Sequence, residues 1–286
     1  MEKLTRILTV VDKVADGPVL LEKSVALARR FGAHVDLLLH DSLHVEAFAT
    51  LCSTLHYREV TVARMHASTA PLHEVILRCA LHASPDLIIK APAGVRPLAR
   101  WTLDENDRSL ADKSPVPVLL VRQKAWSDPV RFAAAVDVSD RDGAEMARSI
   151  LHTAGFLAMG FHGNLDILYS ERERNDETVR MERAVKLAQL VREFHVGCER
   201  LQVLNGEPGK VLSPLVAARH YDVLVLGSQS RRPLRSSISG GTVGQLIEAS
   251  DGDVVLVNAP VQSMREAAPR EVSVPEQRFH EVEQFV

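Results

Sequence analysis

An internal repeat constrains the fold of this chain more than any other feature of its sequence. The apolar run at 6–12, which ends in an aspartate, returns 125 residues later at 131–137. Two further apolar runs, at 86–91 and 118–121, both return 136 residues later. The shared offset predicts that one structural unit occurs twice in the chain, with about 11 additional residues inside the second copy.

Each copy alternates short apolar runs with stretches of helical periodicity. In the first copy we expect strands near 7–11, 35–39, 60–63, 87–90 and 118–121, with helices over 18–31, 71–82 and 103–113. In the second copy we expect strands near 131–137, 165–169, 200–204, 223–226 and 254–257, with helices over 143–154, 177–194, 210–219 and 243–249.

Alternating strands and helices predict an α/β protein with parallel sheets and helices on both faces. The apolar character of the strands agrees, because a parallel strand is buried on both sides. We therefore predict one domain over 1–124 and a second over 128–260, followed by a polar C-terminal tail over 261–286.

Composition and charge narrow the class of protein. A length of 286 residues suits two domains, and a hydrophobic share of 46% excludes wholesale disorder. A net charge of −3 argues against a dedicated nucleic-acid binder. The apolar runs are far shorter than the roughly 20 residues that cross a bilayer, and the N-terminal residues lack a signal-peptide pattern. We therefore expect a cytoplasmic protein with no membrane partner.

Metal-ligating residue types are present, but their spacing is unspecific. The three cysteines lack a CxxC pair, which argues against a disulfide scaffold or a zinc ribbon. Seven of the twelve histidines lie between His34 and His82, and His40 and His44 have Cys52 nearby. A zinc site is one interpretation; scattered surface histidines are the other, and we favour the second. The chain has no Walker A, nucleophile-elbow or HExxH motif.

The loop after the fourth strand of the second copy is the most informative stretch. Ligands of open α/β sheets bind at the carboxyl ends of strands. Here Gly227 begins a small and basic loop, which ends at a glycine pair and Thr242 where a helix starts. Glycine permits close approach of backbone to phosphate, a helix N-terminus supplies unpaired N–H groups, and arginines such as Arg231 suit phosphate geometry. The pattern predicts a phosphate site, with a solvated loop as the alternative.

The repeat layout and this loop resemble the universal stress protein family, in particular its tandem two-domain type, over about residues 4–260. Nucleotide-binding members of that family carry Gly-x2-Gly-x9-Gly-[Ser/Thr] after strand four. Gly227 and Gly240 match its first and third glycines. Ser230 replaces the second glycine, and Gly241 replaces the Ser/Thr, with Thr242 one step on.

The resemblance implies two Rossmann-like domains of the adenine nucleotide alpha hydrolase type, each a five-stranded parallel sheet in the order 3-2-1-4-5. It implies a stress-response protein that binds ATP or ADP, with accompanying Mg²⁺, in the second domain. Its role would be regulatory rather than strongly catalytic. The implied site residues are Asp137 and Leu168 beside the nucleoside, and Leu226, Gly227, Ser228, Ser230, Arg231, Gly240, Gly241 and Thr242 around the phosphates.

The first copy departs from this motif. Ala91 replaces the first glycine, and Pro92 lacks an N–H that could meet a phosphate. Asp104 and Glu105 stand at the start of the following helix, where they would repel a triphosphate. We expect no nucleotide in the first domain, whose crevice would be filled by side chains or hold an uncharged ligand.

The fifth strand of each copy is expected at a sheet edge, and exposed edges invite pairing. In the resembled family this edge mediates dimers, which implies that the two domains pair within the chain. Local covering of each edge and a homodimer are the alternatives.

Two other functions stay open at this point. One is a nucleotide-independent interaction module, or a module for a small apolar ligand, with the same fold. The other is a slow ATPase, for which Asp137 is the one evident carboxylate that could position a metal.

Overall fold

The structure is a computed structural model that describes residues 1, 3–40, 60–65, 70–92, 103–139, 141–171, 176–194, 200–228 and 241–258. Its strands are β1 (Arg6–Val11), β2 (His34–His40), β3 (Val60–Met65), β4 (Leu87–Lys90), β5 (Val118–Leu120), β6 (Arg131–Ala135), β7 (Asn164–Glu171), β8 (Leu201–Asn205), β9 (Val223–Gly227) and β10 (Asp253–Val257). Its helices are the 3-10 turn η1 (Val14–Asp16) and α1 (Gly17–Phe31), α3 (Leu72–Ala83), α4 (Glu105–Lys113), α5 (Arg141–Gly160), α6 (Glu177–Glu193), α7 (Pro208–Arg219) and α8 (Thr242–Ala249).

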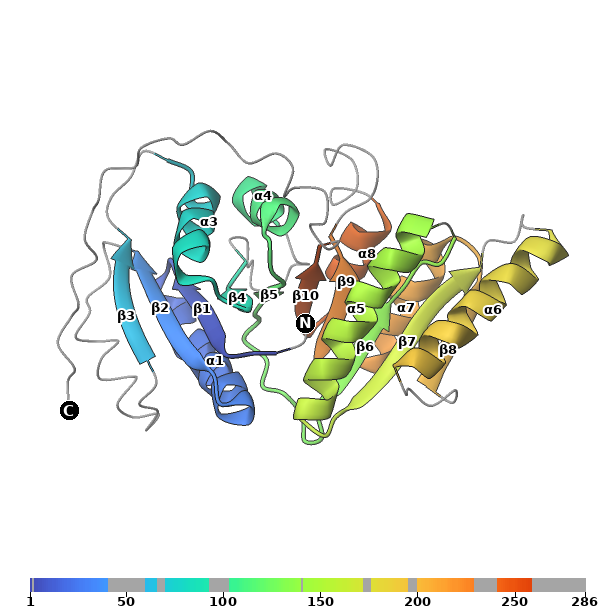
Figure 1. The fold of residues 1–286 in the computed structure, drawn as a ribbon, viewed down its shortest axis with the longest axis horizontal. Coiled ribbons are helices and arrows are strands. Elements are labelled where there is room, and N and C mark those ends of the chain that lie inside the picture. Colours follow the sequence, from blue (N-terminus) through green and yellow to red (C-terminus); the bar gives the residue numbers. More distant parts are fainter. Residues whose placement is uncertain are drawn as a thin grey trace.

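The described strands form one ten-stranded sheet in the order β3-β2-β1-β4-β5-β10-β9-β6-β7-β8. Neighbouring strands run parallel except at the centre, where β5 and β10 are antiparallel. Each half of the sheet therefore has the expected order 3-2-1-4-5, and the predicted α/β architecture with a mostly parallel sheet is confirmed. The fifth strands, which the sequence placed at edges, meet each other in the middle of the sheet (Figure 1).

Helices cover both faces of this sheet. Buried residues of α1, α5 and α6 share one apolar core with the strands, and buried residues of α3, α4, α7 and α8 share the other. Local sequence explains the helix ends. Pro18 fits the first turn of α1, and Gly32 stops it with a left-handed φ of 68°.

The helix α5 is longer than the sequence predicted, because it continues six residues past the expected end at 154. Leu157 and Ala158 in this extension are buried against the first core. The last residue, Gly160, lies so close to α1 that a Cβ there would stand 2.1 Å from the Phe31 ζ carbon. Packing between the two halves therefore stabilises a last turn that local periodicity did not reveal.

Aromatic side chains join the halves on the face covered by α1 and α5. Phe31 of α1 stacks on Phe156 of α5, with ring centroids 4.7 Å apart. Trp126, between β5 and β6, meets Phe161 edge-on at 5.2 Å. Such pairs add to the free energy gained by burying the rings, so the two halves share one continuous interface.

A buried ion pair crosses the same junction. The Asp253 carboxylate, at the start of β10, is fully buried and accepts hydrogen bonds from Lys23 Nζ of α1 at 2.7 and 2.8 Å. It also accepts the backbone N–H of Arg122 at 2.7 Å and Trp126 Nε1–H at 2.7 Å. One carboxylate thus connects α1, the segment after β5 and the centre of the sheet.

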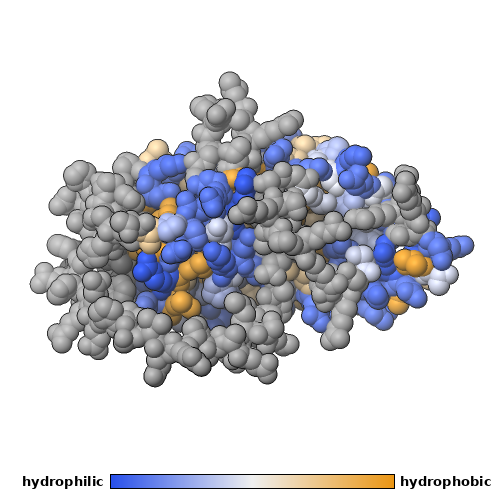
Figure 2. All heavy atoms as spheres, turned by 90° about the horizontal axis from the view of Figure 1, so that it is seen from above, coloured by the Kyte–Doolittle hydropathy of each residue, from blue (hydrophilic) through white to orange (hydrophobic). Residues whose placement is uncertain are grey.

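In the part of the chain that the structure describes, no helix is both long enough and apolar enough to cross a membrane. The face seen in Figure 2 is mainly hydrophilic where it is described, with small separate apolar patches.

Candidate functional site

The carboxyl ends of β6 and β9 define the candidate site in the second half of the chain. These two strands are parallel neighbours, so the residues that follow them emerge at the same edge of the sheet. Asp137 follows β6, Gly227 ends β9, and α8 begins at Thr242. Ser230, Arg231 and Gly240, which the sequence also predicts here, lie outside the described residues.

The start of α8 can hold an anion. Gly241 is its N-cap residue and has no side chain with which to cap the first turn. Its φ of −81° and ψ of 177° are extended backbone. The N–H groups of a first helical turn lack partners within the helix and carry the positive end of the helix dipole. Thr242, half-buried, adds a hydroxyl beside them.

Gly227 has a packing reason for being glycine. A Cβ at this position would stand 2.8 Å from Met146 Cγ and 3.0 Å from its sulfur, so a side chain would push against α5. The glycine therefore brings α5 close to the end of β9. This packing requirement is independent of any ligand, and the motif alone did not indicate it.

Asp137 is exposed, and one of its carboxylate oxygens accepts the backbone N–H of Ser139 at 2.8 Å. Beside it, at the end of β7, the Tyr169 hydroxyl donates to Glu171 at 2.7 Å, and Arg183 of α6 pairs with the same carboxylate at 2.9 Å. Burial raises the pKa of Tyr169, and the hydrogen bond to Glu171 and the charge of Asp137 act in the same direction.

Sequence reasoning missed this Tyr169–Glu171–Arg183 cluster. The strand β7 continues two residues beyond the predicted end at 169. The polar residues Ser170 and Glu171 in this extension were the only local signal in the sequence.

The other predicted residues lie inside the fold. Leu168 and Leu226 are buried in the second core, so their side chains support the sheet rather than line an open surface. Ser228 is 1% exposed: its N–H donates to the Val257 carbonyl at 2.9 Å, and its hydroxyl donates to the Asn258 side chain. The hydroxyl assigned to a phosphate from the sequence is therefore engaged by the protein.

The equivalent crevice of the first half contains a lysine. Lys90 ends β4 and is 1% exposed; its ammonium donates to Asp107 at 2.9 Å and to the Ala91 carbonyl at 2.8 Å. The Asp12 carboxylate, after β1, lies 3.6 Å from the same ammonium. Burial by itself lowers the pKa of Lys90, but Asp107 and Asp12 outweigh it and hold this pKa above its ordinary value.

The start of α4 is closed by its own carboxylates. Asp104 is the N-cap residue and accepts the Asp107 N–H at 2.7 Å, while Asp107 accepts the Asp104 N–H at 3.4 Å. This capping box satisfies the N–H of Asp107 in the first turn and the N–H of Asp104 itself, two donors that a phosphate could otherwise use. The end of β4 and the start of α4 are thus joined by the Lys90–Asp107 pair, which the sequence did not indicate.

No group of three metal-ligating side chains converges among the residues that the structure describes. His44 and Cys52, from the predicted histidine cluster, lie outside those residues.

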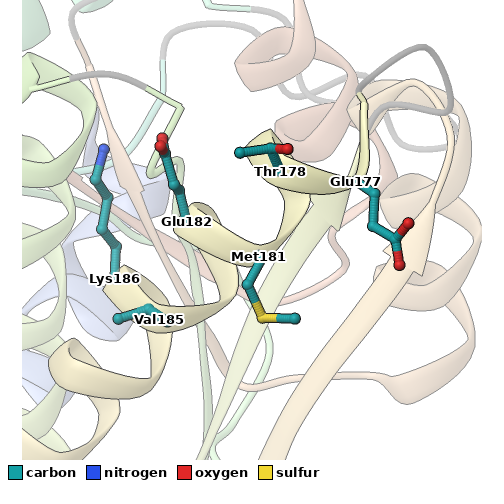
Figure 3. A pocket seen from close by; sticks show the side chains of 6 residues that line it. All are labelled: Glu177, Thr178, Met181, Glu182, Val185 and Lys186. Carbon is teal, nitrogen blue, oxygen red and sulfur yellow. The ribbon is translucent and has the colours of Figure 1, made fainter.

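A depression of about 730 Å³ lies on α6, but all of its lining residues belong to that one helix, so it has no opposing wall (Figure 3). An apolar void at the junction of the halves measures only about 10 Å³, room for about one water. Neither space fits a small-molecule ligand.

The fold and this site define a doubly wound α/β protein with its candidate anion site in one half. Residues 134–258, which contain the candidate site, match the model of the Universal stress protein family. This part of the chain is therefore similar to universal stress proteins.

Two curated relatives agree with this assignment. The chain is 23% identical over 180 residues to the universal stress protein E homolog of Haemophilus influenzae, a match that covers 57% of this chain and 58% of that protein. It is 21% identical over 202 residues to universal stress protein E of Salmonella typhi, covering 64% of each. The chain thus spans less than two thirds of either relative.

Solved structures show the same fold over nearly the whole chain. A candidate universal stress protein from Pseudomonas aeruginosa UCBPP-PA14 has a TM-score of 0.77 at 22% identity, covering 91% of this chain and 95% of its own. A universal stress protein from Archaeoglobus fulgidus has a TM-score of 0.64 at 15% identity, covering 90% and 97%. At these identities the likeness concerns the fold alone.

Proposed function

We propose that the second half of this chain binds an adenine nucleotide, ATP or ADP, and that the protein acts as a nucleotide-responsive regulator in the stress response. The observation that carries the proposal is the β9–α8 unit, where a strand ending in Gly227 leads to a helix that starts at the uncapped Gly241. This unit lies within the residues that match the family model.

In this proposal the phosphates lie against the first turn of α8, with Thr242, Ser230, Arg231 and Gly240 contributing contacts. The nucleoside lies toward Asp137. Any Mg²⁺ would accompany the nucleotide, and Asp137 is the exposed carboxylate at this edge that could serve it.

We infer that the first half, residues 1–124, takes no nucleotide and serves as the partner of the second, residues 128–260. The antiparallel contact between β5 and β10 supports internal pairing of two domains. The Lys90–Asp107 pair and the capping box of α4 support closure of the first crevice.

Isothermal titration with ATP and ADP tests the proposal on the wild type and two variants. Gly241→Asp and Gly241→Asn both fit the extended backbone at this position, and both residues are better N-caps than glycine, so both should fold. Both side chains can cap the first-turn N–H groups, but only the aspartate places a negative charge at the phosphate position. We therefore expect at least a tenfold weaker affinity for the aspartate variant and a smaller loss for the isosteric asparagine.

Two results would count against this site. Wild-type protein that binds neither nucleotide at millimolar concentration would rule out nucleotide binding. Equal affinities of the aspartate and asparagine variants would show that nucleotide binds elsewhere.

A nucleotide-independent interaction module is the second candidate. The engagement of the Ser228 hydroxyl by Asn258 favours it, because one expected phosphate donor is already used. Native mass spectrometry of the purified protein separates the two: a co-purified nucleotide supports the first function, and an apolar molecule or no bound molecule supports the second.

A further inference from the structure

A single side chain connects the start of the candidate loop to the other half of the molecule. Ser228, the first residue after β9, donates its hydroxyl to the side-chain carbonyl of Asn258, the first residue after β10. The Asn258 amide group donates to the carbonyls of Ser114 at 2.6 Å and Asp112 at 3.4 Å. Both carbonyls lie at the C-terminal end of α4, in the first half.

A two-fold related contact exists on the opposite side of the junction. Arg122 follows β5 as Asn258 follows β10, and its Nη1 donates to the Ser250 carbonyl at 2.6 Å. Ser250 is the C-cap residue of α8, as Ser114 is that of α4. In each direction, therefore, the residue after the fifth strand binds the end of a helix in the other half.

The two contacts differ in whether they continue to the loop after the fourth strand. On one side Asn258 also binds Ser228, at the start of the candidate phosphate loop. On the other side the position equivalent to Ser228 is Pro92, which has neither a hydroxyl nor an N–H to offer. A hydrogen-bonded path from a fourth-strand loop to the opposite half therefore runs through Asn258.

The helix at the far end of this path is held at both of its ends. Asn258 engages the last carbonyls of α4, and Lys90 binds Asp107 in its first turn. Figure 1 shows α4 and α8 on either side of the central β5–β10 contact. A change in the position of Ser228 has a direct route to this helix.

We propose that Asn258 is a positioning residue that couples nucleotide occupancy in the second half to the stability of α4 in the first half. The inference rests on the proposed nucleotide function. A ligand at the end of β9 that holds Ser228 in place strengthens the Ser228–Asn258–Ser114 path and so stabilises the end of α4. Because coupling between two sites is reciprocal, an ordered α4 in turn favours nucleotide binding. The stability of α4 in the first half thereby depends on nucleotide occupancy in the second half.

Hydrogen–deuterium exchange of the full chain, with and without saturating Mg·ATP, tests this coupling. In the wild type we expect ATP to slow amide exchange severalfold both in α8 and in α4. In Asn258→Ala we expect protection of α8 to persist and protection of α4 to vanish, with an ATP affinity threefold to tenfold weaker, as the loss of about one hydrogen bond gives.

Three further variants keep the test sharp. Arg122→Ala removes the two-fold related side-chain contact and should leave the ATP-induced protection of α4 intact. Asn258→Asp keeps an acceptor for Ser228 but loses both donors to α4, so it should uncouple α4 even if the alanine variant folds poorly. Ser228→Ala cuts the path at its other end and should give the same result.

The outcomes separate the two claims. ATP binding with unchanged α4 exchange in the wild type would overturn the coupling alone. Equal loss of α4 protection in the Asn258 and Arg122 variants would reduce both residues to general supports of the junction, which also overturns it. Absence of ATP binding would overturn the proposed function and this inference together.

Discussion

Replacing Asp253 by asparagine removes the carboxylate that pairs with Lys23 in the buried junction between the halves. The carboxylate is fully buried, and the Lys23 side chain is only 5% exposed. Burial raises the pKa of Asp253 and lowers the pKa of Lys23, so burial disfavours both charges and each depends on its contact with the other.

The geometry sets the size of the effect. Each carboxylate oxygen accepts Lys23, and each accepts one further donor, from the Arg122 backbone or from Trp126. An asparagine amide turns one of these acceptors into a donor that faces another donor. It also leaves the ammonium of Lys23 buried without its counter-charge. Breaking a buried pair from one side typically costs about 3–5 kcal/mol, and we expect Asp253→Asn to lower the free energy of unfolding by that amount.

Urea denaturation followed by tryptophan fluorescence measures this loss, since Trp126 binds Asp253 directly. Asp251→Asn is the matched control: it lies two residues away and pairs with Lys124 at 3.0 Å in a partly exposed setting. Exposed pairs contribute at most about 1 kcal/mol. A cost for Asp253→Asn no larger than that of the control would refute the view that this ion pair holds the junction.

Three further predictions concern Asp112, Gly160 and Lys90. Burial raises the pKa of Asp112 to about 6, above its ordinary 3.8, so the free energy of unfolding falls as the pH rises through that window and the carboxylate ionises. Asp112→Asn should therefore stabilise the protein against urea at pH 7.5 and not at pH 4. An equal effect at both pH values would contradict this. Gly160→Ala should lower the melting temperature, at a cost of about 1–3 kcal/mol, because its Cβ would overlap Phe31; an unchanged melting curve would show that the ring moves freely. Lys90→Met leaves Asp107 buried without its cation and should cost about 3 kcal/mol or more in the same denaturation assay; a neutral effect would mean that the first crevice does not depend on this pair.

Repeated apolar runs made most of the fold predictable. A common offset of 136 residues aligned β4 with β9 and β5 with β10, and both pairs occupy equivalent places in the sheet. Periodicity and capping residues located the helices because their signals are local. The antiparallel pairing of β5 with β10 depends on contacts between distant segments, so the sequence offered it only as one of several ways to cover an edge.

The candidate site was predictable in part. Gly227 stands out because it matches the first glycine of the phosphate loop, whereas Gly241 stands where that motif has Ser/Thr. The packing of Met146 against Gly227 has no signature in the sequence. From the sequence alone, Lys90 is only the polar residue at the end of an apolar strand. Its pairing with Asp107 arises because α4 brings that carboxylate to the end of β4, which residue spacing cannot show.

The number of ATP molecules bound per chain tests the central claim most directly. Native mass spectrometry of the intact protein at saturating ATP should show one nucleotide per chain in the wild type, with occupancy reduced more by Gly241→Asp than by Gly241→Asn. Two nucleotides per chain would contradict a first crevice closed by Lys90 and Asp107, and none would contradict nucleotide binding at the start of α8.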